Sequence, residues 1–138
     1  MPMSVEMQGE VRIHLEGDIV VVRKTVRNVS TQMGFGITDV TRIVTAASEL
    51  ARNVFLYAGC GVMQWHILQA KDKTGIELSF IDHGPGIPNI SLVMQEGYTT
   101  SGGLGMGLPG SKRLMDELDV QSELEKGTTV TVRKWKRA

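Results

Sequence analysis

A one-sided stripe of apolar residues over residues 39–58 is the feature that most constrains how this chain can fold. Its members recur at intervals of three and four residues: Val40, Ile43, Val44, Ala47, Leu50, Ala51 and Val54. This spacing predicts an amphipathic helix, which Thr38 or Asp39 can cap and which Gly59 and Gly61 stop. Such a helix must bury its stripe, so the fold needs a second layer for it to pack on.

Apolar patterns elsewhere in the chain predict the remaining elements. Helical spacing predicts another helix over residues 18–33, whose apolar side carries Ile19, Val22, Val26, Val29 and Met33. Alternation predicts strands over 10–16, 62–70 and 75–82 and a final hairpin over 119–134, and helices are expected near 90–95 and over 109–118. We therefore expect an α+β fold, a two-layer α/β sandwich in which helices cover one face of a mixed, mostly antiparallel sheet.

Composition narrows the class of protein. The chain has 138 residues, 41% of them hydrophobic, which suits a single domain over 10–138 after a tail of residues 1–9. Lysine plus arginine (15) equals aspartate plus glutamate (15), so no basic field favours nucleic acid or a membrane. The lone Cys60 excludes an internal disulfide, and the apolar run over 19–22 is too short to span a bilayer. Without a recognisable leader segment, the chain is predicted to be cytoplasmic.

The first candidate site lies in the predicted helix over 39–58, where Glu49 and Asn53 stand four residues apart. Such positions differ by about 40° around a helix, so both side chains project from one flank of the apolar stripe. The amide oxygen of Asn53 is a suitable ligand for Mg²⁺, and the Glu49 carboxylate can accept a proton from a hydroxyl. The alternative interpretation is a solvated helix face.

The second candidate site is the run Asp-His-Gly-Pro-Gly over 82–86, with Ile87 after it. Asp82 continues the alternation of the preceding apolar strand, so its carboxylate should point toward the covered face of the sheet. A carboxylate in that position needs a partner, and the amino group of an adenine is a suitable donor. Gly84 and Gly86 would leave room for the base. An ordinary turn is the alternative.

The third candidate site is the glycine-rich segment over 97–108, followed by Pro109 and a helix. Glycine lets backbone N–H groups approach phosphate oxygens, and the start of a helix adds favourable charge for an anion. Pro109 suits the first turn of that helix, and the segment can act as a lid. A surface linker is the alternative. The nucleotide-contacting residues expected here are Thr99, Thr100, Ser101, Gly102, Gly103, Leu104, Gly105, Met106, Gly107 and Leu108.

The fourth candidate site is Gly127-Thr128, at the start of the last predicted strand. Thr128 shares its parity with Val130 and Val132, so its hydroxyl should face the covered side and can reach the adenine end through Asp82 or a water. A strand threonine without any role is the alternative.

These four motifs, in this order, resemble those of the GHKL ATPase superfamily, which includes gyrase, Hsp90-type chaperones and histidine kinases. The chain has no P-loop and no eukaryotic kinase motif. Within the superfamily it resembles the anti-sigma-factor kinase family, the stand-alone serine/threonine kinases of bacterial partner-switching systems, and among them the stressosome switch kinases. The segments that carry this likeness are Glu-Leu-Ala-Arg-Asn (49–53), Asp-His-Gly-Pro-Gly-Ile (82–87) and Gly-Leu-Gly-Met-Gly-Leu-Pro-Gly (103–110).

The resemblance implies an ATP- and Mg²⁺-dependent protein serine/threonine kinase that phosphorylates STAS-domain scaffold and antagonist proteins. When released from them, such a kinase binds and activates a serine phosphatase. Asn53 would hold Mg²⁺, and Glu49 would act as the base or orient the acceptor hydroxyl. Asp82 would bind the adenine amine, and the glycines at 84, 86, 103, 105 and 107 would shape the pocket and lid. Some members carry an arginine in the lid, and no arginine occurs between residues 97 and 110, so Lys112 or a group of the substrate would supply that charge.

Two other functions share the same nucleotide site. A histidine-kinase catalytic fragment would need an upstream helix with a phosphoacceptor histidine, and an ATP-bound anti-sigma factor would sequester its target without phosphotransfer. The basic end of the chain, over 133–137, is interpreted as a strand edge and a solvated tail and not as a nucleic-acid site.

Overall fold

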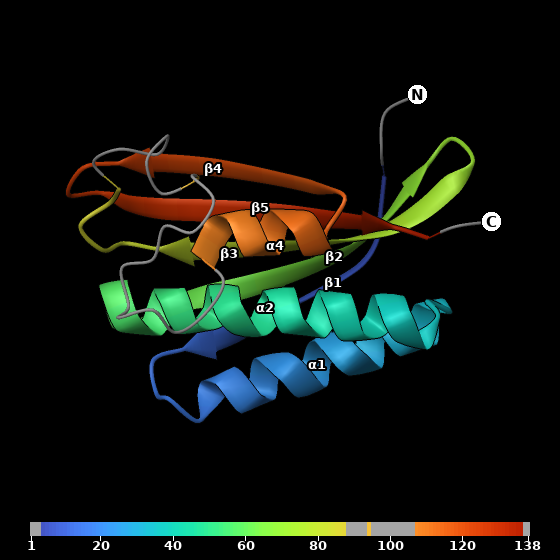
Figure 1. Ribbon diagram of the computed structural model, residues 1–138, viewed down its shortest axis with the longest axis horizontal. Helices are drawn as coiled ribbons and strands as arrows, with labels where there is room; N and C mark the ends of the chain where they lie inside the picture. The colour runs from blue at the N-terminus through green and yellow to red at the C-terminus, as the bar shows by residue number, and fades with distance from the viewer. Residues whose placement is uncertain (1–3, 88–93, 95–106, 137–138) are drawn as a thin grey trace.

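The computed structural model describes residues 4–87, 94 and 107–136. Within them the strands are β1 (Ser4–Ile13), β2 (Gly61–Ala70), β3 (Lys73–Asp82), β4 (Glu117–Glu123) and β5 (Gly127–Trp135). The helices are α1 (Asp18–Met33), α2 (Ile37–Ala58) and α4 (Gly107–Leu114). The strands form one sheet in the order β1-β2-β3-β5-β4, and all three helices lie on the same side of it, with α2 between α1 and α4 (Figure 1).

This arrangement confirms the predicted α+β sandwich with one covered face. The sheet was expected to be mixed, but all four strand pairings in the described residues are antiparallel. The predicted apolar sides of α1 and α2 are buried in the core, apart from Met33, which is partly buried. None of the described helices is both long and apolar enough to cross a membrane.

Several boundaries differ from those predicted, because strand pairing overrides local alternation. The first strand, expected over 10–16 after a tail of residues 1–9, instead runs from Ser4, since residues from Ser4 onward pair with β2. It ends at Ile13 because the backbone N–H groups of His14 and Leu15 turn to donate to the Asp18 carboxylate, at 3.0 and 2.9 Å. These two bonds lower the pKa of the Asp18 carboxyl. Leu15, which lies within the strand predicted over 10–16, is exposed.

The helices are also bounded differently. Gly36 caps α2, where Thr38 or Asp39 was expected, and no side chain bonds to the helix start. The helix predicted over 109–118 runs from Gly107 to Leu114 and contains Pro109 in its first turn, as expected. It ends early because β4 begins at Glu117 and pairs with β5. The helix expected near 90–95 lies outside the described residues, except for Met94.

A buried lysine joins α2, α4 and the sheet. The Lys134 side chain lies on the covered face of β5 and is only 6% exposed. Its ammonium group donates to the Leu114 carbonyl at the end of α4, at 2.9 Å, and lies 3.8 Å from Asp39 and 3.6 Å from Asp116. A buried charge is stable only when it is paired in this way. On the uncovered face Arg133 bonds to Glu77 at 2.7 Å, so Arg133 and Lys134 both have acidic partners within the chain.

Candidate functional site

A row of polar side chains marks the point where the apolar core of the sheet ends. Strand register places Gly61 opposite Asp82, Asp82 opposite Thr128, and Thr128 opposite Ser122. The neighbouring row on the covered face is apolar and includes Met63, Phe80 and Val130. Three oxygen-bearing side chains from three adjacent strands are therefore aligned at one end of the helix-covered face.

Asp82 holds the turn that follows β3. It continues the parity of Ile76, Leu78 and Phe80, which are almost completely buried, as the sequence predicted. Its Oδ1 accepts the Gly84 N–H at 2.9 Å, which fixes the carboxylate in place. Within the described residues Oδ2 accepts no hydrogen bond, so this oxygen remains able to accept one from a ligand.

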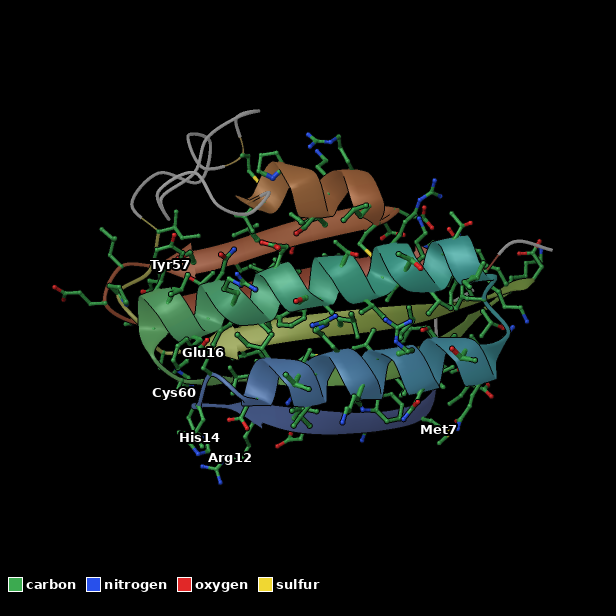
Figure 2. All side chains as sticks on the ribbon, turned by 60° about the horizontal axis from the view of Figure 1, so that its bottom comes forward. Met7, Arg12, His14, Glu16, Tyr57 and Cys60 are labelled. Atoms are coloured by element: carbon green, nitrogen blue, oxygen red, sulfur yellow. The ribbon has the colours of Figure 1, made fainter. Side chains whose placement is uncertain are left out.

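Glycine is required where this turn packs on the rest of the domain. A Cβ on Gly84 would lie 2.7 Å from the Ala58 side chain at the end of α2. Gly86 has a φ of 81°, and a Cβ there would lie 2.5 Å from the Glu123 carbonyl oxygen. In addition, the Glu125 N–H donates to the Pro85 carbonyl at 2.8 Å. The turn over 83–87 is thereby held between α2 and the β4–β5 hairpin. Figure 2 shows Tyr57 and Cys60 at this end of α2.

Glu49 and Asn53 both lie on the half-buried flank of α2 where the sequence placed them. Asp39, Ala46 and Asn53 are spaced seven residues apart, about two helical turns, and therefore lie on one side of α2. The contacts of Asp39 and Ala46 show which neighbouring elements this side faces. Asp39 reaches Lys134 on β5, and Ala46 is completely buried. The flank of α2 that carries Asn53 therefore faces β5 and α4, and α2 packs against α4.

The glycine-rich segment is only partly described. Thr99, Thr100, Ser101, Gly102, Gly103, Leu104, Gly105 and Met106 lie outside the described residues. Gly107 begins α4 with a φ of 64°, and Leu108 is buried in the core. Lys112, the candidate for the missing lid charge, is exposed on α4. The buried Leu108 side chain packs the first turn of α4 against the core.

Thr128 has a partner that sequence reasoning missed. Its Oγ1 lies 2.8 Å from the Ser122 Oγ, on the neighbouring strand β4. Ser122 alternates with Leu118 and Val120, which are partly buried against the core, and this parity was the signal that could have placed it on the covered face. Asp82, Ser122 and Thr128 lie at the rim of a hollow of about 290 Å³ at this end of the sheet, which is also lined by Ile81, Gln121 and Thr129 from the uncovered face.

The arrangement suits a nucleotide with its base at the polar row. Asp82 offers an acceptor to an exocyclic amine, and Thr128 offers a hydroxyl beside it. No group of three or more His, Cys, Asp or Glu side chains placed to hold a metal occurs among the described residues. Mg²⁺ usually takes several ligands from phosphate oxygens and water, and the amide oxygen of Asn53 is of the hard type that this ion accepts.

Residues 38–138 match the family of histidine kinase-, DNA gyrase B- and HSP90-like ATPases. The chain belongs to this family. The serine/threonine-protein kinase RsbT of Bacillus subtilis is 50% identical over 130 residues, covering 94% of this chain and 98% of the relative. The anti-sigma F factor of Priestia megaterium is 32% identical over 119 residues, covering 81% of this chain and 80% of the relative.

Solved structures show the same fold at low identity. A crystal structure of the RsbU and RsbW domains of a Mycobacterium tuberculosis protein superposes with a TM-score of 0.63 at 20% identity, covering 94% of this chain and 33% of that longer one. The SiaB–SiaC complex of Pseudomonas aeruginosa gives 0.57 at 12% identity, covering 95% and 90%. These comparisons confirm the predicted superfamily and, through RsbT, the predicted protein serine/threonine kinase that uses ATP.

Proposed function

We propose that this kinase belongs to a bacterial partner-switching module and phosphorylates serine or threonine on STAS-domain scaffold and antagonist proteins of a stressosome. When released from them, it binds and activates a downstream serine phosphatase. The observation that supports this best is the 50% identity to RsbT across almost the whole of both chains, combined with the polar row at the end of the core.

In the proposed mechanism, adenine lies at the polar row and the phosphates lie toward α4. Asp82 accepts a hydrogen bond from the adenine amine, and the turn over 83–87 leaves room for the base because it contains Gly84 and Gly86. Asn53 holds Mg²⁺, which when bound would neutralise charge on the phosphates. Glu49, one turn earlier on the same flank, orients the acceptor hydroxyl and takes its proton.

The charge on the transferred phosphoryl group needs a further cation. Lys112 lies on the exposed side of α4, the helix that follows the glycine-rich segment. It supplies that cation in the proposed mechanism, unless the protein substrate brings its own. If the substrate supplies the cation instead, hydrolysis of ATP by the kinase alone should be slow, and transfer to the bound STAS partner should be fast.

Incubation with γ-labelled ATP, Mg²⁺ and candidate STAS proteins tests this function. Label on serine or threonine of the partner supports the proposal. Label on a histidine of this chain would instead indicate a histidine kinase. The similarity to anti-sigma F factors favours a second candidate, a sigma-factor antagonist, and tight binding of a sigma factor without label on any protein would support it.

Asp82→Asn should weaken ATP binding by about a hundredfold, because a charged acceptor facing the adenine amine is replaced by a neutral amide. The amide oxygen can still accept the Gly84 N–H, so the turn is expected to keep its shape. Titration calorimetry with Mg-ATP measures the change. Asp119→Asn, on an exposed position of β4, is the matched control and should bind as the wild type does. Equal affinity in both variants would contradict the role of Asp82.

A further inference from the structure

Among the described residues, the Ser122 side chain makes more hydrogen bonds at the polar row than the side chain of Asp82 or Thr128, the two residues predicted from the sequence. Its Oγ accepts the Ile87 N–H at 2.7 Å, lies 2.8 Å from the Thr128 Oγ1, and lies 3.2 Å from the Gly127 carbonyl. One hydroxyl on β4 thus connects the turn after β3 with the first residues of β5. Within the described residues, no other side chain forms hydrogen bonds to both the turn after β3 and the start of β5.

The number of protons limits how these bonds can be arranged. Each hydroxyl has a single hydrogen, and the Ile87 N–H already occupies one acceptor position on Ser122. If Ser122 donates to Gly127, Thr128 must donate to Ser122 and can only accept from a ligand. If Ser122 donates to Thr128, the hydrogen of Thr128 is free for an acceptor on the ligand. The state of the Ser122 hydroxyl therefore decides whether Thr128 is a donor or an acceptor.

A purine presents both kinds of group on its edge, an amine that donates and ring nitrogens that accept. Asp82 can serve only the donor, because a carboxylate has no hydrogen to give. A ring nitrogen beside the amine needs a donor, and Thr128 is the neighbour of Asp82 in the register of the sheet. The second arrangement provides that donor: Ser122 gives its hydrogen to Thr128 at 2.8 Å and gives up the longer bond to the Gly127 carbonyl at 3.2 Å.

We propose that Ser122 is a positioning residue for the nucleotide: it orients the Thr128 hydroxyl as a donor to the purine ring and holds the adenine-side turn through Ile87. This inference rests on the proposed function, because it assumes that a nucleotide base lies at the polar row. Ser122 acts through Thr128 and Ile87 and is not assigned to the chemistry of transfer.

The turn has other attachments, so a change at Ser122 can be separated from a loss of folding. The Glu125 N–H bond to Pro85 and the Gly84 N–H bond to Asp82 do not involve Ser122. Ser122 is half-buried on the outermost strand, where loss of a hydroxyl leaves little empty space. Ser122→Ala should therefore fold and keep its strand pairing, while Thr128 loses its orientation.

The test compares three variants with the wild type. Ser122→Ala should raise the Kd and KM for Mg-ATP by about tenfold, while kcat stays within about twofold. Ser122→Thr, which keeps a hydroxyl and favours a strand, should bring both values back to within about threefold of the wild type. Ser79→Ala is the matched control, because Ser79 and Thr131 form a similar pair of hydroxyls, 3.3 Å apart, on the uncovered face of the sheet. It should behave as the wild type does.

The outcomes separate this inference from the function on which it rests. If the folded wild type binds no nucleotide, the proposed function fails and this inference fails with it. If the wild type binds and Ser122→Ala binds equally well, or loses kcat with an unchanged KM, the inference alone is overturned. Should Ser122→Ala not fold, Ser122→Cys replaces it, because its thiol is a weaker hydrogen-bonding group of similar shape and should raise KM in the same way.

Discussion

Asn53→Ala is expected to lower the rate of phosphotransfer by about a thousandfold, because the Mg²⁺ ion that neutralises the phosphate charge would lose its proposed ligand on α2. The fold should be unaffected, since Asn53 lies on the half-buried flank of the helix and not in its apolar stripe. Single-turnover transfer from labelled ATP to a STAS partner measures the loss. Thermal unfolding of the same samples shows whether the domain remains intact.

The dependence on magnesium identifies the cause of this loss. With nucleotide saturating, the wild type should respond to added Mg²⁺ while Asn53→Ala responds weakly at every concentration. Asn28→Ala, an exposed asparagine on α1, is the control for removing an amide from a helix and should transfer phosphate normally. Normal transfer by Asn53→Ala would show that α2 does not hold the metal.

Glu49→Ala extends the same test to the proposed base. Loss of a general base typically lowers the rate by about a hundred- to ten-thousandfold, and binding of Mg-ATP should be almost unchanged. The two variants therefore differ in a measurable way, since only Asn53→Ala should weaken the response to the metal. If Glu49→Ala retained full activity, the acceptor hydroxyl would have to lose its proton to another group.

Gly127→Ala is expected to lower the free energy of unfolding by about 3 kcal/mol. The φ angle of Gly127 is 123°, a region that side chains rarely adopt, and a Cβ there would overlap the Asp82 carbonyl oxygen and contact the His83 backbone. Both obstacles are backbone atoms, so the strand and the turn would have to separate. Urea denaturation followed by far-UV circular dichroism measures the change.

A matched glycine tests whether the effect comes from the backbone conformation. Gly17 has a φ of −62° and nothing within 4 Å of a Cβ added to it, so Gly17→Ala should change the free energy of unfolding by less than about 0.5 kcal/mol. If Gly127→Ala and Gly17→Ala unfold at the same urea concentration, that result contradicts the close packing of Gly127 on the backbone at the end of β3.

Local sequence patterns were sufficient to predict the helices and strands and the face of each on which a given side chain lies. Strand and helix periods placed Asp82 and Thr128 on the covered face and Asn53 on the flank of α2, and the structure has all three there. These inferences succeed because the direction of a side chain follows from its position within a strand or helix. The end points of elements were less accurate. Residues 4–9 carry no clear strand pattern, yet they pair with β2.

The contacts of the polar row depended on tertiary structure. The predicted final hairpin can bring Ser122 beside Thr128. The sequence near Ser122 does not show that it also meets Ile87, because that contact requires β5 to lie between β3 and β4. The burial of Lys134 likewise depends on α2 and α4 bringing Asp39 and the Leu114 carbonyl to it.

The sequence by itself determined the periodic elements, the face on which each candidate residue lies and the order of the motifs, because each of these follows from local spacing along the chain. Only the tertiary structure decided the order of the strands and therefore which polar side chains bond to one another. The physical reason is that a strand's hydrogen-bonding edges accept any partner of suitable length, and the choice among partners is made by the packing of the whole core.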